Sequence, residues 1–158
     1  MADARIFEDL KADHDRHRAM LAELAAANFA DRAALFETLR VEISAHAAAE
    51  EESLYATMLG RPELRDDARH SVSEHKEIDD FLTLLFEMDM SSSAWLPKFR
   101  EMRHRYEHHI DEEEEEMFPE AAKDLSKAEQ DRLAKIFETR KPKELAIAGE
   151  ATPGDARE

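Results

Sequence analysis

The sequence predicts an all-α protein, an up-down-up-down four-helix bundle with a short fifth helix at the C-terminal end. Residues that favour helices dominate the 158-residue chain, whereas the β-branched residues that a sheet needs are scarce, with two Val, six Ile and five Thr. The three Gly and five Pro lie almost wholly between segments of helical periodicity or near the C-terminus. Four such segments of about 25 residues, joined by short turns, are typical of this bundle.

The first two helices are bounded by residues that start and stop helices. We expect the first to begin after an N-cap at Asp3 and to reach about Ala27. Asp31 is the expected N-cap of the second, which runs to about Met58, where Gly60 follows.

The third and fourth helices are separated by three serines. Pro62 is expected to open the third helix, which reaches about Met90. One of Ser91 to Ser93 then caps the fourth, in which Pro97 falls within the first turn, where proline is tolerated. This helix is expected to end near Pro119.

The C-terminal part is expected to contain a short helix and a tail. Ser126 and Glu129 have the spacing of a capping box, which predicts a helix to about Arg140. Residues 141–158 have the composition of a disordered tail. The folded domain is therefore expected to span residues 1–140.

Charge and composition exclude several classes of function. Acidic side chains outnumber basic ones by 38 to 22, and the resulting net charge of −16 repels nucleic acids and anionic membrane surfaces. No apolar run approaches the ~20 residues of a membrane span or has the form of a signal peptide, so a cytoplasmic location is expected. Because the chain has no cysteine, any metal must be held by nitrogen and oxygen ligands.

Polar residues interrupt the apolar stripe of every long segment. A histidine lies near the middle of each inward face, and two faces add a glutamate one turn later: His14, His17, His46, Glu50, His75, His109 and Glu113.

The pattern also repeats. A shift of 61 residues aligns Asp13-His14 with Glu74-His75, and a shift of 63 aligns HAAAEEESLY (46–55) with HIDEEEEEMF (109–118). Two helical hairpins of one design are therefore expected to pack together.

Such a polar layer in a core needs a compensating partner. An unpaired buried polar group costs roughly 2–7 kcal/mol, and a charge costs more. Two cations would compensate, because each HxxxE pair presents an imidazole and a carboxylate on one helix face, with the glutamates as bridges and His14 and His75 completing the set. Imidazole and carboxylate suit iron, manganese or zinc, and two neighbouring metals favour redox-active iron.

These residues resemble the hemerythrin-like (HHE cation-binding) domain. The resemblance extends from about Ile6 to about Arg140 and rests on DH at 13–14, HxxxE at 46–50, EH at 74–75 and HxxxEE at 109–114 followed by MFP. It implies a non-haem di-iron centre that reacts with oxygen, peroxide or nitric oxide in an oxygen or redox response. By this resemblance the metal ligands are His14, His46, Glu50, His75, His109 and Glu113.

The oxygen-carrying members of this family have a second histidine one turn from the first in the third helix. Here the positions four residues from His75 are Ser71 and Asp79, so simple oxygen carriage is not expected. His17 and Tyr106 are candidates to fill or line this gap as further residues of the cofactor site. Asp79 is either an additional carboxylate ligand or a residue that faces solvent.

Several alternatives remain open at this point. Carriers place the helix-4 carboxylate five residues after the histidine, which would select Glu114, whereas the internal repeat favours Glu113. His70 is expected at the surface, and His104 and His108 lie off the apolar stripe. A ferritin-like bundle would need two ExxH motifs, and the one present fits the inward stripe poorly. The other functions considered are an iron-handling or sensing module without turnover and a metal-free helical interaction domain. Either a monomer or a homodimer is expected, with signalling through a separate protein partner.

Overall fold

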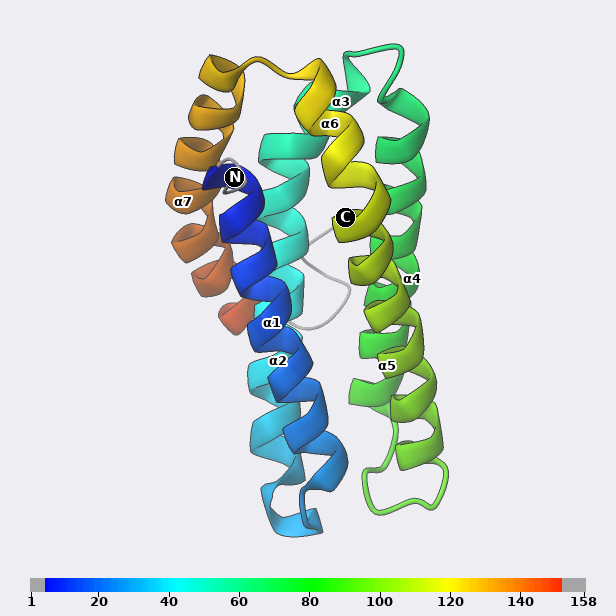
Figure 1. Ribbon diagram of the computed structural model, residues 1–158. Coiled ribbons are helices and arrows are strands. Elements are labelled where there is room, and N and C mark those ends of the chain that lie inside the picture. Colours follow the sequence, from blue (N-terminus) through cyan, green and yellow to red (C-terminus); the bar gives the residue numbers. More distant parts are fainter. Residues whose placement is uncertain (1–4, 152–158) are drawn as a thin grey trace.

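The computed structural model describes residues 5–151, which form helices and turns without a β-strand (Figure 1). The long helices are α1 (Arg5–Ala26), α2 (Phe29–Glu50), α4 (Arg65–Glu87), α5 (Trp95–Glu112) and α7 (Lys127–Glu150). Two π-helical turns, η1 (Glu51–Tyr55) and η2 (Glu113–Met117), continue α2 into α3 (Ala56–Leu59) and α5 into α6 (Phe118–Asp124). The predicted four-helix bundle with an added C-terminal helix is confirmed.

Some helix starts differ from the predicted ones. The expected cap at Asp3 lies outside the described residues. Asn28, rather than Asp31, caps α2, since its side-chain oxygen accepts a hydrogen bond from the Asp31 backbone N–H. Residues 62–64 form turns, so α4 begins at Arg65 and not at Pro62. Ala94 occupies the N-cap position of α5, where a serine was expected.

Two helix ends also differ. The third helix stops at Glu87 instead of about Met90. The fourth continues through Pro119 to Asp124, because the π-helical turn before this proline has already shifted the backbone hydrogen bonds, with Phe118 N–H donating to the Glu113 carbonyl. The proline is thus accommodated at the start of α6 instead of ending the helix.

The C-terminal helix is longer than predicted and corrects the expected tail over residues 141–150, whereas residues 152–158 lie outside the described part of the chain. α7 reaches Glu150 although Pro142 lies inside it, so residues 141–150 are helical. Contacts to the bundle offset the hydrogen bond that proline removes: Arg140 pairs with Glu52, and an Arg40 guanidinium N–H donates to the Ala148 carbonyl at 3.3 Å. α7 therefore lies along α1 and α2, on the side of the bundle away from α4 and α5 (Figure 1).

The apolar core is divided into two clusters. The first apolar cluster is centred on Phe7, Leu54 and Phe118, and the second on Leu21, Leu82 and Trp95. Between the two clusters, the buried residues of α1 are Asp13, His14 and His17. A polar layer therefore crosses the middle of the bundle. No helix within residues 5–151 is long and apolar enough to cross a membrane.

Candidate metal centre

The structure brings together all six residues predicted as metal ligands in this polar layer. Each of them is at most 4% exposed: His14, His46, Glu50, His75, His109 and Glu113. The imidazole rings pair, with centroids 5.0 Å apart for His14 and His46 and 4.9 Å apart for His75 and His109. Glu50 stands between the pairs, because its Oε1 is 3.2 Å from His75 Nε2 and 3.7 Å from His46 Nε2.

Two groups of potential donor atoms share Glu50. One group joins Glu50 and Glu113 to His75 and His109, and the other joins Glu50 to His14 and His46, with the atoms of each group within 4.8 Å of one another. Such clusters of imidazole nitrogens and carboxylate oxygens suit iron, manganese or zinc. The two groups lie side by side and share one carboxylate.

The donor atoms that face the centre make no well-oriented hydrogen bond, although some of them lie close to one another, such as His109 Nε2 and Glu113 Oε1. Within residues 5–151, the buried side-chain atoms without a hydrogen bond are concentrated here: Nε2 of His14, His46, His75 and His109, both carboxylate oxygens of Glu50, and Oε1 of Glu113. Leaving a polar atom buried and unpaired costs about 1–3 kcal/mol. Atoms of this kind converging on one point fit a bound cation.

A second layer of carboxylates orients the four histidines. Each Nδ1 faces a carboxylate oxygen: His14 to Glu114 (2.7 Å), His46 to Asp13 (2.8 Å), His75 to Glu51 (3.3 Å) and His109 to Glu74 (2.9 Å). Because an ionised carboxylate can only accept, each Nδ1 carries the donated proton, so each ring in its neutral form turns an Nε2 lone pair toward the centre.

Sequence reasoning missed the role of these carboxylates, although the internal repeat contained a signal for it. Asp13 and Glu74 match under the shift of 61, and Glu51 and Glu114 match under the shift of 63. In the structure Asp13 and Glu74 accept hydrogen bonds from the histidines of α2 and α5. Glu51 and Glu114 accept hydrogen bonds from the histidines of α4 and α1. The repeat therefore extends from the candidate ligands to the groups that hold them.

Glu113 and Glu114 have different surroundings. Glu113 is buried, and its Oε1 lies 2.5 Å from His109 Nε2. The side chain of Glu114 is 21% exposed and accepts hydrogen bonds from His14 and, at 2.9 Å, from Arg18. The geometry favours Glu113 as the inward carboxylate, as the repeat suggested.

Tyr55 is a buried member of the centre that sequence reasoning did not single out. Its hydroxyl donates to Glu113 Oε2 at 2.6 Å, and its ring packs 5.4 Å from that of His75. The shift of 63 residues aligns Tyr55 with Phe118 of the other hairpin, and the Phe118 ring stacks on that of His14 with the ring centroids 6.0 Å apart. The two halves of the centre thus share their ring packing, and one adds a proton donor.

Burial and neighbouring charges shift the pKa values of several groups in the centre. Burial, reinforced by the charge of Glu113, raises the pKa of the Glu50 carboxyl well above its usual value. Burial also lowers the pKa of His46 to about 3. Burial opposes a charge on His109 as well, but the adjacent Glu113 carboxylate raises the pKa of that imidazole to about 10. Two crowded carboxylates among mostly neutral imidazoles attract positive charge to this point.

His17 and Tyr106 lie beside the six residues and bind each other. The His17 Nε2–H faces Glu42 Oε2 at 3.3 Å, so His17 Nδ1 accepts the Tyr106 hydroxyl proton at 2.7 Å. Both ring nitrogens of His17 therefore have partners, unlike those of the four histidines above. Asp79 is half-buried and belongs to none of the donor groups found within residues 5–151.

A small cavity adjoins the centre. Its volume is about 10 Å³, and its lining includes His46, His75 and Tyr106 together with the apolar side chains of Ile43 and Leu82. A cavity needs about 10–15 Å³ to hold one water molecule. Only a molecule of a few atoms would fit here without movement of the surrounding side chains.

Fold and site together define a helical-bundle protein with a buried histidine and glutamate cluster suited to cations. The sequence matches the family described as Hemerythrin HHE cation binding domain over residues 5–121, and the chain belongs to that family. A similar fold is found in the crystal structure of a hemerythrin HHE cation binding domain-containing protein from Mycobacterium kansasii, with a TM-score of 0.80 and 24% identity over 99% of this chain and 96% of that one. No curated protein matches the sequence.

Proposed function

We propose that this protein holds two non-haem iron ions and binds or reacts with a small oxidant, namely oxygen, peroxide or nitric oxide, in an oxygen or redox response. The observation that carries the proposal is the set of inward donor atoms without hydrogen bonds, which two cations held by the two donor groups that share Glu50 would satisfy. His14 and His46 would serve one ion, and His75 and His109 the other. Manganese or zinc could replace iron in the same donor set.

Bound iron would supply redox electrons and a coordination position for the oxidant. The protein contributes orientation and exclusion of water: carboxylates hold the Nδ1 side of each histidine, and an apolar cluster lies on each side of the layer. The cavity beside His46 and His75 supports a substrate of a few atoms. Two hydroxyl groups also lie in this region as hydrogen-bond donors. The Tyr55 hydroxyl donates to Glu113, and the Tyr106 hydroxyl donates to His17.

Metal analysis and optical spectroscopy test the proposal. The purified chain should contain close to two metal ions, with a ligand-to-iron absorption band that reductant removes, and His109→Ala should lose both. His104→Ala changes an exposed histidine of the same helix and should retain them. Well under one iron, manganese or zinc per chain would refute the proposal.

Kinetic measurements then separate reaction from sensing. Consumption of peroxide or nitric oxide by the iron-loaded protein, lost in His109→Ala, would favour reduction of the oxidant. A band that appears in air and is reversed without turnover would favour an iron or oxygen sensor.

A further inference from the structure

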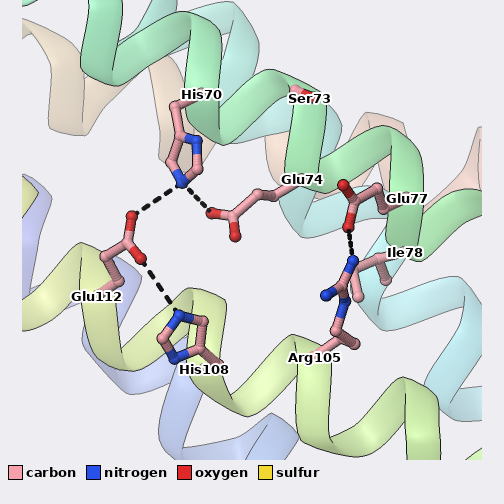
Figure 2. Close-up of a pocket in the computed structure, with 8 residues that line it drawn as sticks. All are labelled: His70, Ser73, Glu74, Glu77, Ile78, Arg105, His108 and Glu112. Carbon is pink, nitrogen blue, oxygen red and sulfur yellow. Dashed lines mark hydrogen bonds and ion pairs between the residues drawn. The ribbon is translucent and has the colours of Figure 1, made fainter.

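A surface cleft between α4 and α5 contains a second cluster of histidine and glutamate (Figure 2). Its volume is about 270 Å³. Each helix contributes a histidine followed four residues later by a glutamate, His70 with Glu74 and His108 with Glu112. Residues at this spacing share one helix face, so two HxxxE pairs face each other across the helix pair.

The polar ends of three of these side chains, His70, Glu74 and Glu112, converge, and His108 contacts the second carboxylate oxygen of Glu112. His70 Nε2 lies 3.0 Å from Glu112 Oε1 and 3.3 Å from Glu74 Oε1, and His108 Nε2 lies 3.4 Å from Glu112 Oε2 (Figure 2). The donor atoms of His70, Glu74 and Glu112 all lie within 4.8 Å of one another. The histidine side chains are 55% and 67% exposed, so an ion from solvent can reach them directly.

The cleft is connected to the buried centre through one carboxylate. Glu74 Oε1, which contacts His70, also accepts the hydrogen bond from His109 Nδ1 at 2.9 Å. This contact keeps Glu74 in place, with its side chain only 18% exposed. Two of the four groups in the cleft are thus partly buried carboxylates, since the Glu112 side chain is 27% exposed.

We propose that His70, Glu74, His108 and Glu112 form a separate surface site for one divalent transition-metal ion. Two imidazoles and two carboxylates without thiolate match the ligand preferences of Zn²⁺, Fe²⁺ and Mn²⁺. This site is additional to the buried centre, and it does not depend on whether that centre holds iron. Its ion would share Glu74 with the hydrogen bond that orients His109.

Zinc binding to the full chain tests the site. The protein is purified with its resident metal, desalted, and titrated with Zn²⁺ by calorimetry, and the metal content of the same samples is measured before and after. We expect the wild type to take up one more Zn²⁺ per chain than the double variant His70→Gln/His108→Gln, in which the affinity of that ion falls at least 100-fold. Both residues are exposed, so the substitutions should leave the fold intact.

His104→Gln is the matched control, because His104 is another exposed histidine of α5 that does not line this cleft. It should bind zinc within twofold of the wild-type affinity. Equal zinc uptake by the wild type and the double variant would overturn the inference. Zinc uptake in the cleft of a protein that carries no resident metal would support this site while refuting the proposed di-iron function.

Discussion

Replacement of Lys141 tests how the C-terminal helix supports the candidate metal centre. Its Nζ donates to Asp13 Oδ2 at 2.7 Å and to Glu42 Oε2 at 3.3 Å, and the residue is only 9% exposed. Although burial opposes ionisation, the hydrogen bond from His46 and the charge of Lys141 hold the pKa of Asp13 well below its usual range. Lys141→Met keeps the apolar stem but leaves two carboxylates without this cation.

The expected loss of stability follows from this geometry. Removing one partner of a buried ion pair costs about 3–5 kcal/mol. Arg16 remains 3.0 Å from Asp13 and 2.8 Å from Glu42, so compensation is partial and we expect a loss of about 2–3 kcal/mol. For a chain of this size each 1 kcal/mol shifts Tm by about 2–4 °C, so Tm should fall by about 4–12 °C.

Urea unfolding followed by circular dichroism, with and without chelator, measures this loss. Lys143→Met is the matched control, since Lys143 is an exposed lysine of the same helix and should change stability by less than about 0.5 kcal/mol. In the double variant Asp13→Asn/Lys141→Met, the loss of stability should be smaller than the sum of the losses in the two single variants by more than about 1 kcal/mol. A Lys141→Met protein as stable as Lys143→Met would refute the reasoning.

Three further predictions concern separate parts of the chain. Glu114→Ala removes the carboxylate that orients His14 and should weaken metal binding by about 10–100-fold in a chelator competition, whereas unchanged affinity would deny Glu114 this role. Burial and a neighbouring carboxylate raise the pKa of Asp9 from 3.8 to about 7, so the folded chain binds this proton more tightly than the unfolded one. Stability should therefore fall as pH rises from about 4 through 7, and Asp9→Asn should show a smaller fall in a Tm series; parallel curves would contradict this. Pro142→Ala restores a backbone donor inside α7 and should raise stability by about 1–3 kcal/mol, measured by urea unfolding; a loss would mean that the proline fits its position better than alanine.

The positions in the polar layer were predictable because helical periodicity assigns each residue to a face. Histidine and glutamate on an apolar stripe stand out against Leu and Phe, and the repeat between the two hairpins marked the same positions twice. Periodicity does not state which group on a neighbouring helix a side chain reaches. The pairing of Asp13 with His46, and of Glu74 with His109, therefore required the structure.

The C-terminal helix was underestimated for a different reason. Pro142 and the polar composition after Arg140 are local signals for a helix end, and they were outweighed by contacts with residues more than 80 positions away. The same long-range contacts bring Lys141 to Asp13. Tyr55 was missed because it follows the π-helical offset after Glu50, which the regular helical spacing used for the sequence does not include.

The division of the core into two apolar clusters predicts a reversal of the usual order in which helices open locally. Helices ordinarily exchange their amide hydrogens first at frayed ends and last at the packed middle. Here each end of the bundle has its own apolar cluster, while the middle contains buried donor atoms without hydrogen bonds. Without ions, the amides around His46 and His109 should exchange early while both ends stay protected. Under the proposed function, metal ions would then enter or leave by a central opening of the bundle, without unfolding of the chain.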